Sequence, residues 1–302
     1  MTREPPGGRL SVVGTPIGNL EDLSPRALGT LRAAAAIVAE DTRRTRALLA
    51  HFGVGGKALI ALDAHASEAR VDSVLRRLAA GERVALVTDA GMPGVSDPGA
   101  RLVRAARDAG VAVEVLPGPS AVTAAAALSG LVEGPFVFAG FLPRKGGARR
   151  DALARVAGSA WPVVLFEAKG RLEETLRELA ALAPDRRACV CRELTKLHEE
   201  VVEGRLAELA ALGREWLGEL TVVVAPRAEA TGAAAELAAG EDLDALATRL
   251  LAAGRSPKDA AAELAAAGGI PRRDAYERVL RAREASPPGA REASPPGARA
   301  RR

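Results

Sequence analysis

Short apolar runs with the character of strands alternate with helical segments over the first 226 residues, and this alternation limits the fold more than any other feature. In the first half the predicted strands are residues 10–14, 36–39, 58–63, 84–88 and 113–116, and the predicted helices are residues 25–33, 42–51, 67–80, 99–109 and 121–128. A regular alternation of this kind predicts a parallel sheet that is covered by helices on both faces.

The second half contains strands and helices in a less regular order. Its predicted strands are residues 136–139, 163–166, 188–192 and 220–224, with 199–204 as a further strand that would make the sheet mixed, and its predicted helices are 149–156 and 172–182. We therefore predict an α/β protein with two α/β domains, residues 1–130 and 131–226, one with a parallel and one with a mixed sheet.

The end of the chain has a different character. After Pro226 only helices are expected, at residues 243–253, 257–266 and 272–283, and Ser256 followed by Pro257 is typical of a helix start. This predicts a small C-terminal helical domain at residues 240–283. Residues 284–302 contain REASPPGA twice and have few apolar groups, which predicts a disordered tail.

The composition narrows the class of protein. Of 302 residues 48% are hydrophobic, but no apolar run reaches the roughly 18 to 20 residues of a membrane span, and the start lacks the apolar core of an export signal. We expect a cytoplasmic protein with no membrane partner. Cys189 and Cys191 occupy alternate positions of a predicted strand, so they are interpreted as core residues in preference to a redox or metal pair.

The charge balance and the aromatic content bear on possible partners. A net charge of +4 gives a mild bias toward polyanions such as RNA. Aromatic residues are only 3% of the chain, which argues against a base-stacking platform, so any RNA contact is expected to rest mainly on arginine and backbone. The histidines His51, His65 and His198 are too scattered to predict a metal site.

Loops rich in glycine and proline follow three predicted strands, at residues 14–19 (GTPIGN), 89–99 (DAGMPGVSDPG) and 117–120 (PGPS). Ligands of open α/β sheets bind beyond the carboxyl ends of the strands, and glycine lets the backbone approach them closely. The first loop is not Gly-x-Gly-x-x-Gly, so a dinucleotide site is not supported. Asp97 and Ser120 have an alternative role as helix caps, whereas Asp89 is the stronger candidate for ligand contact.

Charged residues follow three other predicted strands. Residues 40–45 (EDTRRT) place acids and arginines at a helix start, where they either cap the helix or contact a substrate. Residues 166–169 (FEAK) and 192–196 (RELTK) carry two of the five lysines to strand ends. For residues 40–45, the sequence leaves open whether they cap the helix or contact a substrate. The candidates for acid–base chemistry are Glu40, Asp41, Glu167, Glu193 and Lys196.

Several long motifs occur in one order between residues 10 and 224. They are LSVVGTPIGNLEDLSPRAL, AEDTRRT, VTDAGMPGVSDPG, LPGPSA, FAGFLPRKG and CRELTKLHEEVVEG. In this order they resemble the ribosomal RNA small subunit methyltransferase I family, bacterial members of the tetrapyrrole-methylase superfamily that methylate the 2′-hydroxyl of a cytidine near the decoding centre of 16S rRNA. The resemblance implies a tetrapyrrole-methylase-like fold with S-adenosyl-L-methionine bound between the two α/β domains, and a homodimer.

The resemblance also implies which residues contact the cofactor, namely Pro16, Asp89, Gly91, Pro93, Val95, Asp97, Pro117, Gly118, Ser120, Ala121, Phe166 and Glu167. The catalytic candidates are Glu40, Asp41 and Lys196, and the candidates for RNA contact are Arg43, Arg44, Lys145 and Arg192. One departure from the family's usual pattern is FEAKGR at residues 166–171, which lacks a histidine before the arginine.

Two other functions stay open at this point. A precorrin-type tetrapyrrole methylase would share the cofactor, although such enzymes usually carry Gly-x-Gly-x-Gly-Asp where this chain has GTPIGN. A non-enzymatic nucleic-acid-binding protein could use the basic tail at residues 299–302 and residues 257–283 as a helix-turn-helix-like pair with its turn at Gly268 and Gly269. The loops at Asp89 and Pro117 would then have no role. The favoured prediction is 2′-O-methylation, dependent on S-adenosylmethionine, of a cytidine in 16S rRNA of the small ribosomal subunit.

Overall fold

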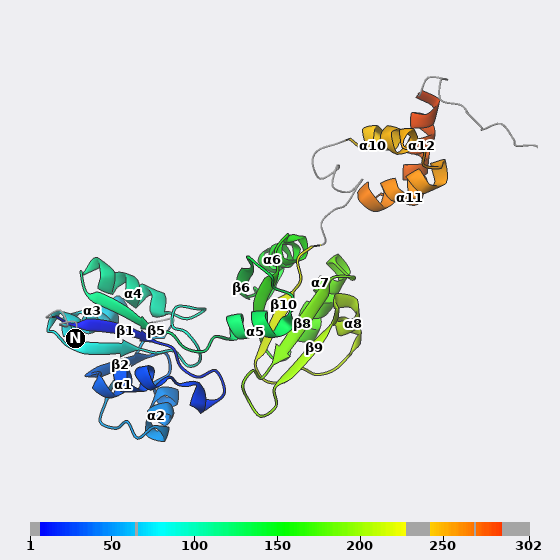
Figure 1. Ribbon diagram of the computed structural model, residues 1–302. Coiled ribbons are helices and arrows are strands. Elements are labelled where there is room, and N and C mark those ends of the chain that lie inside the picture. The colour runs from blue at the N-terminus through cyan, green and yellow to red at the C-terminus, as the bar shows by residue number, and fades with distance from the viewer. Residues whose placement is uncertain (1–6, 64–65, 228–241, 269, 286–302) are drawn as a thin grey trace, which may run out of the picture. The chain divides into compact units, whose positions relative to one another are not determined.

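The computed structural model of the protein (Figure 1) describes residues 7–63, 66–227, 242–268 and 270–285. The chain divides into two compact units, residues 1–227 and residues 228–302. The first unit contains two sheets of five strands each, and the helices described in the second unit form a bundle. The predicted domain bounds at residues 130 and 226 stay a prediction.

The first sheet has the strand order β3-β2-β4-β1-β5, and all neighbouring strands are parallel, which confirms the predicted parallel sheet. Its strands are β1 (Arg9–Val13), β2 (Ala36–Ala39), β3 (Ala58–Ala61), β4 (Arg83–Leu86) and β5 (Ala112–Leu116). The helices of this part are η1 (Leu20–Asp22), α1 (Pro25–Ala33), α2 (Thr42–His51), α3 (Glu68–Ala79), α4 (Gly99–Asp108) and α5 (Ala121–Ser129). Only the short 3-10 helix η1 was not expected from the sequence.

Helices cover both faces of the first sheet, and Figure 1 shows α3 and α4 on the side opposite to α1 and α2. Leu10 and Val12 of β1 belong to the core beneath α3 and α4, whereas Val13 belongs to the core beneath α1 and α2. Successive side chains of a strand point to opposite faces, so a strand buried on both faces must be apolar throughout. This explains the uninterrupted apolar sequence of β2.

The second sheet has the order β6-β7-β10-β8-β9 and is mixed, as expected. Only β6 and β7 are parallel, and the other neighbouring pairs are antiparallel. Its strands are β6 (Val137–Phe141), β7 (Val163–Glu167), β8 (Arg187–Arg192), β9 (Glu200–Arg205) and β10 (Leu220–Val224), and its helices are α6 (Gly146–Gly158), α7 (Leu172–Leu182) and α8 (Leu206–Ala211). The sequence did not predict α8.

Both faces of the second sheet are packed as well. Val163 and Leu165 lie in the core beneath α6 and α7, and Val164 lies in the core with α5. Cys189 and Cys191 are buried in the same core as Val164, are free thiols and have sulfur atoms 3.8 Å apart, which confirms them as core residues. The hydrogen bond to Cys189 and burial raise the pKa of the Cys191 thiol, so this group is a poor nucleophile at neutral pH.

The second unit contains α10 (Leu243–Ala252), α11 (Pro257–Gly268) and α12 (Arg272–Ala285), packed around their own apolar core. The Ser256 hydroxyl accepts a hydrogen bond from the Asp259 backbone N–H (3.2 Å), which confirms Ser256 as a helix cap. Gly269 of the predicted turn and residues 286–302 of the predicted tail lie outside the described residues. No helix of the described part is long and apolar enough to span a membrane.

Candidate functional site

A cavity of about 400 Å³ collects the loops that follow the strands of the first sheet. Its wall contains Glu40 after β2, residues 88–92 and 95–97 after β4, and Ser120 and Ala121 after β5. This volume lies within the roughly 300–1,000 Å³ that is usual for small-molecule sites. The carboxyl edge of the parallel sheet is therefore one side of a site with room for a ligand.

The second sheet supplies the other side of this cavity. Phe166, Glu167 and Ala168 lie at the end of β7, and residues 218–221 lie at the start of β10. Because β10 is antiparallel to β7, with Leu220 opposite Glu167, the start of one strand lies beside the end of the other. The segments that follow β1 and β8 also meet directly, since the Asn19 backbone N–H donates to the Thr195 hydroxyl (3.0 Å).

The loop after β4 is held in shape by its own hydrogen bonds. The Asp97 carboxylate accepts from the backbone N–H groups of Gly94 (2.8 Å) and Gly99 (2.6 Å), so it fixes the loop and the first turn of α4. Gly91 pairs with Thr15 as a short antiparallel bridge. Ser96, at the loop tip, has a positive φ of 62°, which is rare for a residue with a side chain.

A close approach of two backbones anchors the loops after β1 and β5. A Cβ atom added to Gly14 would lie 2.7 Å from the Gly118 Cα, and a Cβ added to Gly118 would lie 2.9 Å from the Gly14 carbonyl carbon. The Gly14 N–H also donates to the Leu116 carbonyl (3.0 Å). Both glycines are therefore required for the loops to pack, although neither lines the cavity.

The two adjacent acids after β2 have different surroundings. Asp41 caps α2 by accepting from the Arg43 backbone N–H (2.8 Å), and its carboxylate also pairs with the Arg43 side chain (2.7 Å). These bonds lower the pKa of Asp41 to about 2. Glu40 lines the cavity and accepts from the Thr88 hydroxyl through Oε2 (2.9 Å). No hydrogen bond or ion pair involves Glu40 Oε1 in the part of the chain that the structure describes.

Asp89, directly beyond β4, links the β2 and β4 loops. Its Oδ1 accepts from the Asp41 backbone N–H (3.0 Å), and its Oδ2 lies 3.4 Å from Arg44 Nη1. Both Asp89 and Arg44 line the cavity. A carboxylate held in this way remains able to accept a further hydrogen bond, because each of its oxygens has more than one lone pair.

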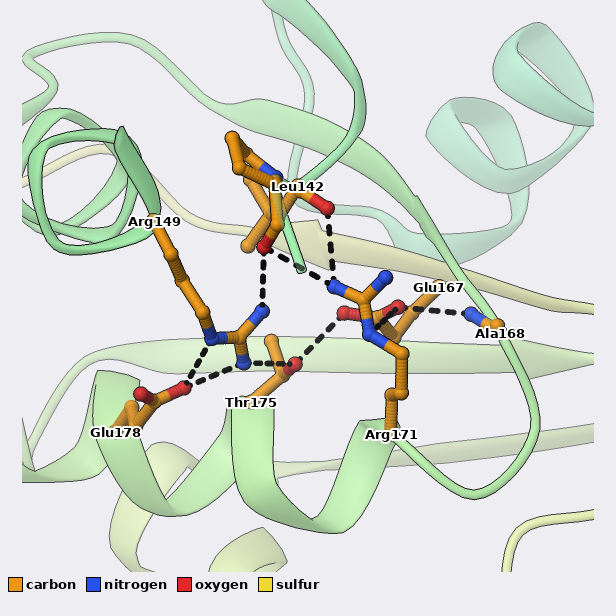
Figure 2. A network of polar contacts seen from close by, with 8 residues as sticks. Leu142, Arg149, Glu167, Ala168, Arg171, Thr175 and Glu178 are labelled. Atoms are coloured by element: carbon orange, nitrogen blue, oxygen red, sulfur yellow. Dashed lines mark hydrogen bonds and ion pairs between the residues drawn. The ribbon is translucent and has the colours of Figure 1, made fainter. Parts of the chain in front are cut away.

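Glu167 is the centre of a buried polar network, which Figure 2 shows from close by. Its carboxylate accepts from the Thr175 hydroxyl (2.7 Å) and from the Ala168 N–H (2.8 Å), and it lies 3.3 Å from Arg171 Nε. Arg149 donates to the same Thr175 oxygen (2.9 Å) and pairs with Glu178. The fully buried Glu167 side chain therefore fixes the cavity wall from within.

The predicted cations after β8 are bound by neighbouring residues. Lys196 pairs with Glu193 (3.0 Å) and Glu219 (3.1 Å), and these pairs raise its pKa despite the opposing effect of burial. Arg192 donates to the Leu217 carbonyl (2.8 Å) and lies 3.5 Å from Glu200. Both cations hold the segments around the second sheet together.

The cavity brings together only part of the predicted site. The predicted residues that line it are Glu40, Arg44, Asp89, Gly91, Val95, Asp97, Ser120, Ala121, Phe166 and Glu167. Those that do not line it are Pro16, Asp41, Arg43, Pro93, Pro117, Gly118, Lys145, Arg192 and Lys196. Among the described residues no cluster of histidine, cysteine and acidic side chains could hold a metal ion.

Sequence reasoning missed the contribution of β6 and β10 to the wall. Phe141 at the end of β6 and Thr221 in β10 both line the cavity. Phe141 belongs to the FAGFLPRKG motif, which was a usable signal. Thr221 had none, because its place depends on the antiparallel direction of β10.

Comparison with known proteins agrees with this architecture. Residues 9–210 match the family model described as Tetrapyrrole (Corrin/Porphyrin) Methylases. A protein of Xylella fastidiosa named Ribosomal RNA small subunit methyltransferase I is 51% identical over 203 residues, which are 67% of this chain and 74% of that one. A protein of Mycobacterium bovis with the same name is 46% identical over 281 residues, covering 91% of this chain and 96% of that one.

Solved structures show the same fold at lower sequence identity. The methyltransferase CobJ has a TM-score of 0.56 with 21% identity, covering 74% of this chain and 97% of that chain. Uroporphyrin-III C-methyltransferase from Thermus thermophilus, solved with S-adenosylhomocysteine, has a TM-score of 0.51 with 23% identity, covering 72% of this chain and 92% of that chain. The predicted tetrapyrrole-methylase-like α/β fold is thereby confirmed.

Proposed function

Since the chain belongs to the tetrapyrrole methylases and, within them, to the ribosomal RNA small subunit methyltransferase I family, we propose that it methylates ribosomal RNA with S-adenosylmethionine as the methyl donor. The finer proposal is that the acceptor is the 2′-hydroxyl of one cytidine in 16S rRNA of the small ribosomal subunit. The observation that carries it is that loops of the family's sequence motifs line one cavity together, with Glu40 in its wall.

The residues of the cavity fit this cofactor. Val95, Ala121 and Phe166 offer apolar surface suited to an adenine ring. The Ser120 hydroxyl, which makes no capping hydrogen bond with α5, and the backbone of the loop after β4 offer polar groups for the ribose and the amino-acid part. When bound, S-adenosylmethionine supplies a methyl group carried on a positively charged sulfur.

Glu40 is the residue best placed to receive the proton of the acceptor hydroxyl. The Thr88 hydrogen bond orients its carboxylate, and Oε1 accepts the proton as the hydroxyl oxygen attacks. Asp41 is less suited, because a group with a pKa of about 2 is a weak base at neutral pH and its oxygens are bound by Arg43. The preformed loops contribute alignment of the reacting groups, an effect that reaches about 7–11 kcal/mol in well-oriented reactions.

Contact with RNA phosphates is proposed for exposed cations around the cavity. Arg43 has 85% of its side chain exposed, and Lys145 is exposed before α6 without an ion pair among the described residues. Arg44 lines the cavity itself. Arg192 is less suited, since only 20% of its side chain is exposed and its guanidinium is bound to Leu217 and Glu200. A homodimer in the cytoplasm, acting on the assembled subunit, completes the proposal.

The test is an assay with labelled S-adenosylmethionine on small ribosomal subunits that lack the modification, followed by mass spectrometry of the RNA. Label on the ribose of one cytidine is the expected result. Label on a base would refute the 2′-hydroxyl as acceptor. Transfer to a precorrin-like tetrapyrrole, with none to the subunits, would favour the alternative function within the same superfamily. Light scattering of the purified chain tests the homodimer.

A further inference from the structure

Three of the chain's five phenylalanines gather beside the cavity, although the low aromatic content argued against any stacking platform. The ring of Phe166 lies 5.0 Å from that of Phe138 and 5.5 Å from that of Phe141, measured between centroids. Phe138 and Phe166 are half-buried, whereas Phe141 is 56% exposed and lines the cavity. The cluster therefore ends in one accessible ring at the site.

A bulge in β6 puts Phe141 on this face. In a regular strand, residues three positions apart point to opposite faces, so Phe138 and Phe141 would be separated by the sheet. The pairing with β7 shifts between Phe138 and Gly140, and Gly140 has a φ of +63°, as a bulge with glycine in the left-handed region requires. The extra residue turns Phe141 to the face of Phe138, opposite Phe166 of β7.

The chain that follows Phe141 is held by the polar network of Figure 2. Arg171 donates to the carbonyls of Leu142 (2.9 Å) and Pro143 (3.3 Å), and Arg149 donates to that of Pro143 (3.2 Å). Both arginines also bind the Thr175–Glu167 pair. The backbone that follows the exposed ring is thus held to the cavity wall, which reduces the backbone entropy lost when a ligand binds.

We infer that Phe141 is the surface on which the base of the target nucleotide stacks while its ribose enters the cavity. This rests on the proposed function and names the part of the RNA that the site recognises. When the ribose hydroxyl of a nucleotide enters the cavity, the nucleotide is drawn away from its neighbours in the RNA, and its nucleobase loses the stacking partners that an aromatic ring at the site can replace.

The charge around Phe141 fits RNA. Arg144 and Lys145 follow it three and four residues later, within about 14 Å along the chain. Both are exposed, and neither has an ion pair in the described part of the protein. Two exposed cations that closely follow an accessible aromatic ring along the chain suit the phosphates that flank a base. Arginine also occurs in subunit interfaces, so the oligomeric state of the F141A variant separates RNA from a second copy of this chain as the partner of this surface.

The experiment compares Phe141 variants in methylation of small subunits that lack the modification. In F141A the KM for subunits rises by about 5- to 150-fold, the factor that corresponds to loss of one base–aromatic stack. F141L, which keeps apolar volume without a π-face, shows most of this rise, and F141W restores KM to about the original value. The Kd of S-adenosylmethionine, from calorimetry, and the oligomeric state stay as in the original protein.

Trp161 provides the matched control. It is also 56% exposed but precedes β7, at the end of the strand away from the cavity, so W161A leaves KM unchanged. A normal KM for F141L overturns the inference, as does an equal weakening of S-adenosylmethionine binding or a change of oligomeric state in F141A. If the unaltered protein transfers no methyl group to subunits, the proposed function fails and the inference with it, which is a separate and recognisable result.

Discussion

In this site, residues of the same chemical type have different roles, and the groups that each residue binds decide which role it has. Glu40 and Asp41 are adjacent acids at the same strand end, yet Glu40 has an oxygen without a hydrogen-bond partner among the described residues, whereas Asp41 caps a helix. Likewise, Asp97 and Glu167 were both expected to touch the cofactor. Their carboxylate oxygens instead accept hydrogen bonds from the protein's own amides and a hydroxyl. Such residues act on a ligand by positioning the backbone around it.

The contrast between Glu40 and Asp41 can be tested by isosteric variants. E40Q keeps the bond to Thr88 but loses the base, so kcat falls by about 10²- to 10⁴-fold while the Kd of S-adenosylmethionine is unchanged. D41N serves as the control and loses less than about tenfold, through a weaker cap. Single-turnover methylation of subunits measures both. If E40Q retains full turnover, another group receives the proton.

The titration of Asp41 offers a second test. Its pKa is lowered from 3.8 to about 2, chiefly by the hydrogen bond from the Arg43 side chain. Because the pKa of Asp41 is lower in the folded state than in the unfolded state, the ionised carboxylate stabilises the fold at pH values above the unfolded-state pKa. This contribution is lost as pH falls from about 4 to 2. Carbon-13 shifts of the carboxyl group should give a midpoint near 2, which moves toward 3.8 in R43A. A midpoint near 4 in the unaltered protein would contradict the ion pair.

Elements could largely be predicted from the sequence, because buried strands and amphipathic helices carry local periodicity. The exceptions are informative. Neither η1 nor α8 has enough residues to show a period, and the bulge at Gly140 depends on pairing with β7. The loops of the site were predicted from their glycine and proline content. The contribution of Thr221 was not, since strand direction is a tertiary property.

Because the loops after β1 and β5 are in close contact, one methyl group added at Gly14 should lower the stability of the protein. G14A would place a Cβ 2.7 Å from the Gly118 backbone, so we expect a loss of stability of about 1–3 kcal/mol, as for other overpacked sites, and weaker S-adenosylmethionine binding. G29A is the control, because Gly29 lies in α1 with open space around it and alanine should stabilise the helix by about 0.5–1 kcal/mol. Urea unfolding and calorimetry measure both effects. Equal behaviour of the two variants would contradict the close approach.

The network that joins β7, α7 and α6 should be sensitive to loss of its central hydroxyl. T175V leaves Glu167 and Arg149 each without one buried partner, which should lower the free energy of unfolding by about 1–3 kcal/mol. T175S retains the hydroxyl and should lose much less. Denaturant unfolding distinguishes them. A T175V protein as stable as T175S would mean that the hydroxyl contributes no net stability.

In the molecule as a whole, the cavity proposed for methyl transfer and the helical bundle belong to different units of the chain. Every residue that lines the cavity lies within residues 1–227, and this unit has its own apolar cores. The match to the tetrapyrrole methylase family model ends at residue 210, before the second unit begins, whereas the Mycobacterium bovis relative matches 91% of the chain. The bundle of α10, α11 and α12 has a separate core, so it is expected to contribute to substrate binding without shaping the cofactor site.

Truncation after Arg227 tests this division of roles. The shortened chain should bind S-adenosylmethionine with an unchanged Kd, because no cavity residue is removed. Its KM for small subunits should rise by about 100-fold, the lower end of what a tethered second binding module contributes. A chain that ends at Ala285 keeps all three helices, so it separates the effect of the bundle from that of residues 286–302. An unchanged KM after truncation at Arg227 would exclude the bundle from substrate binding, and loss of cofactor binding would show that the two units depend on each other.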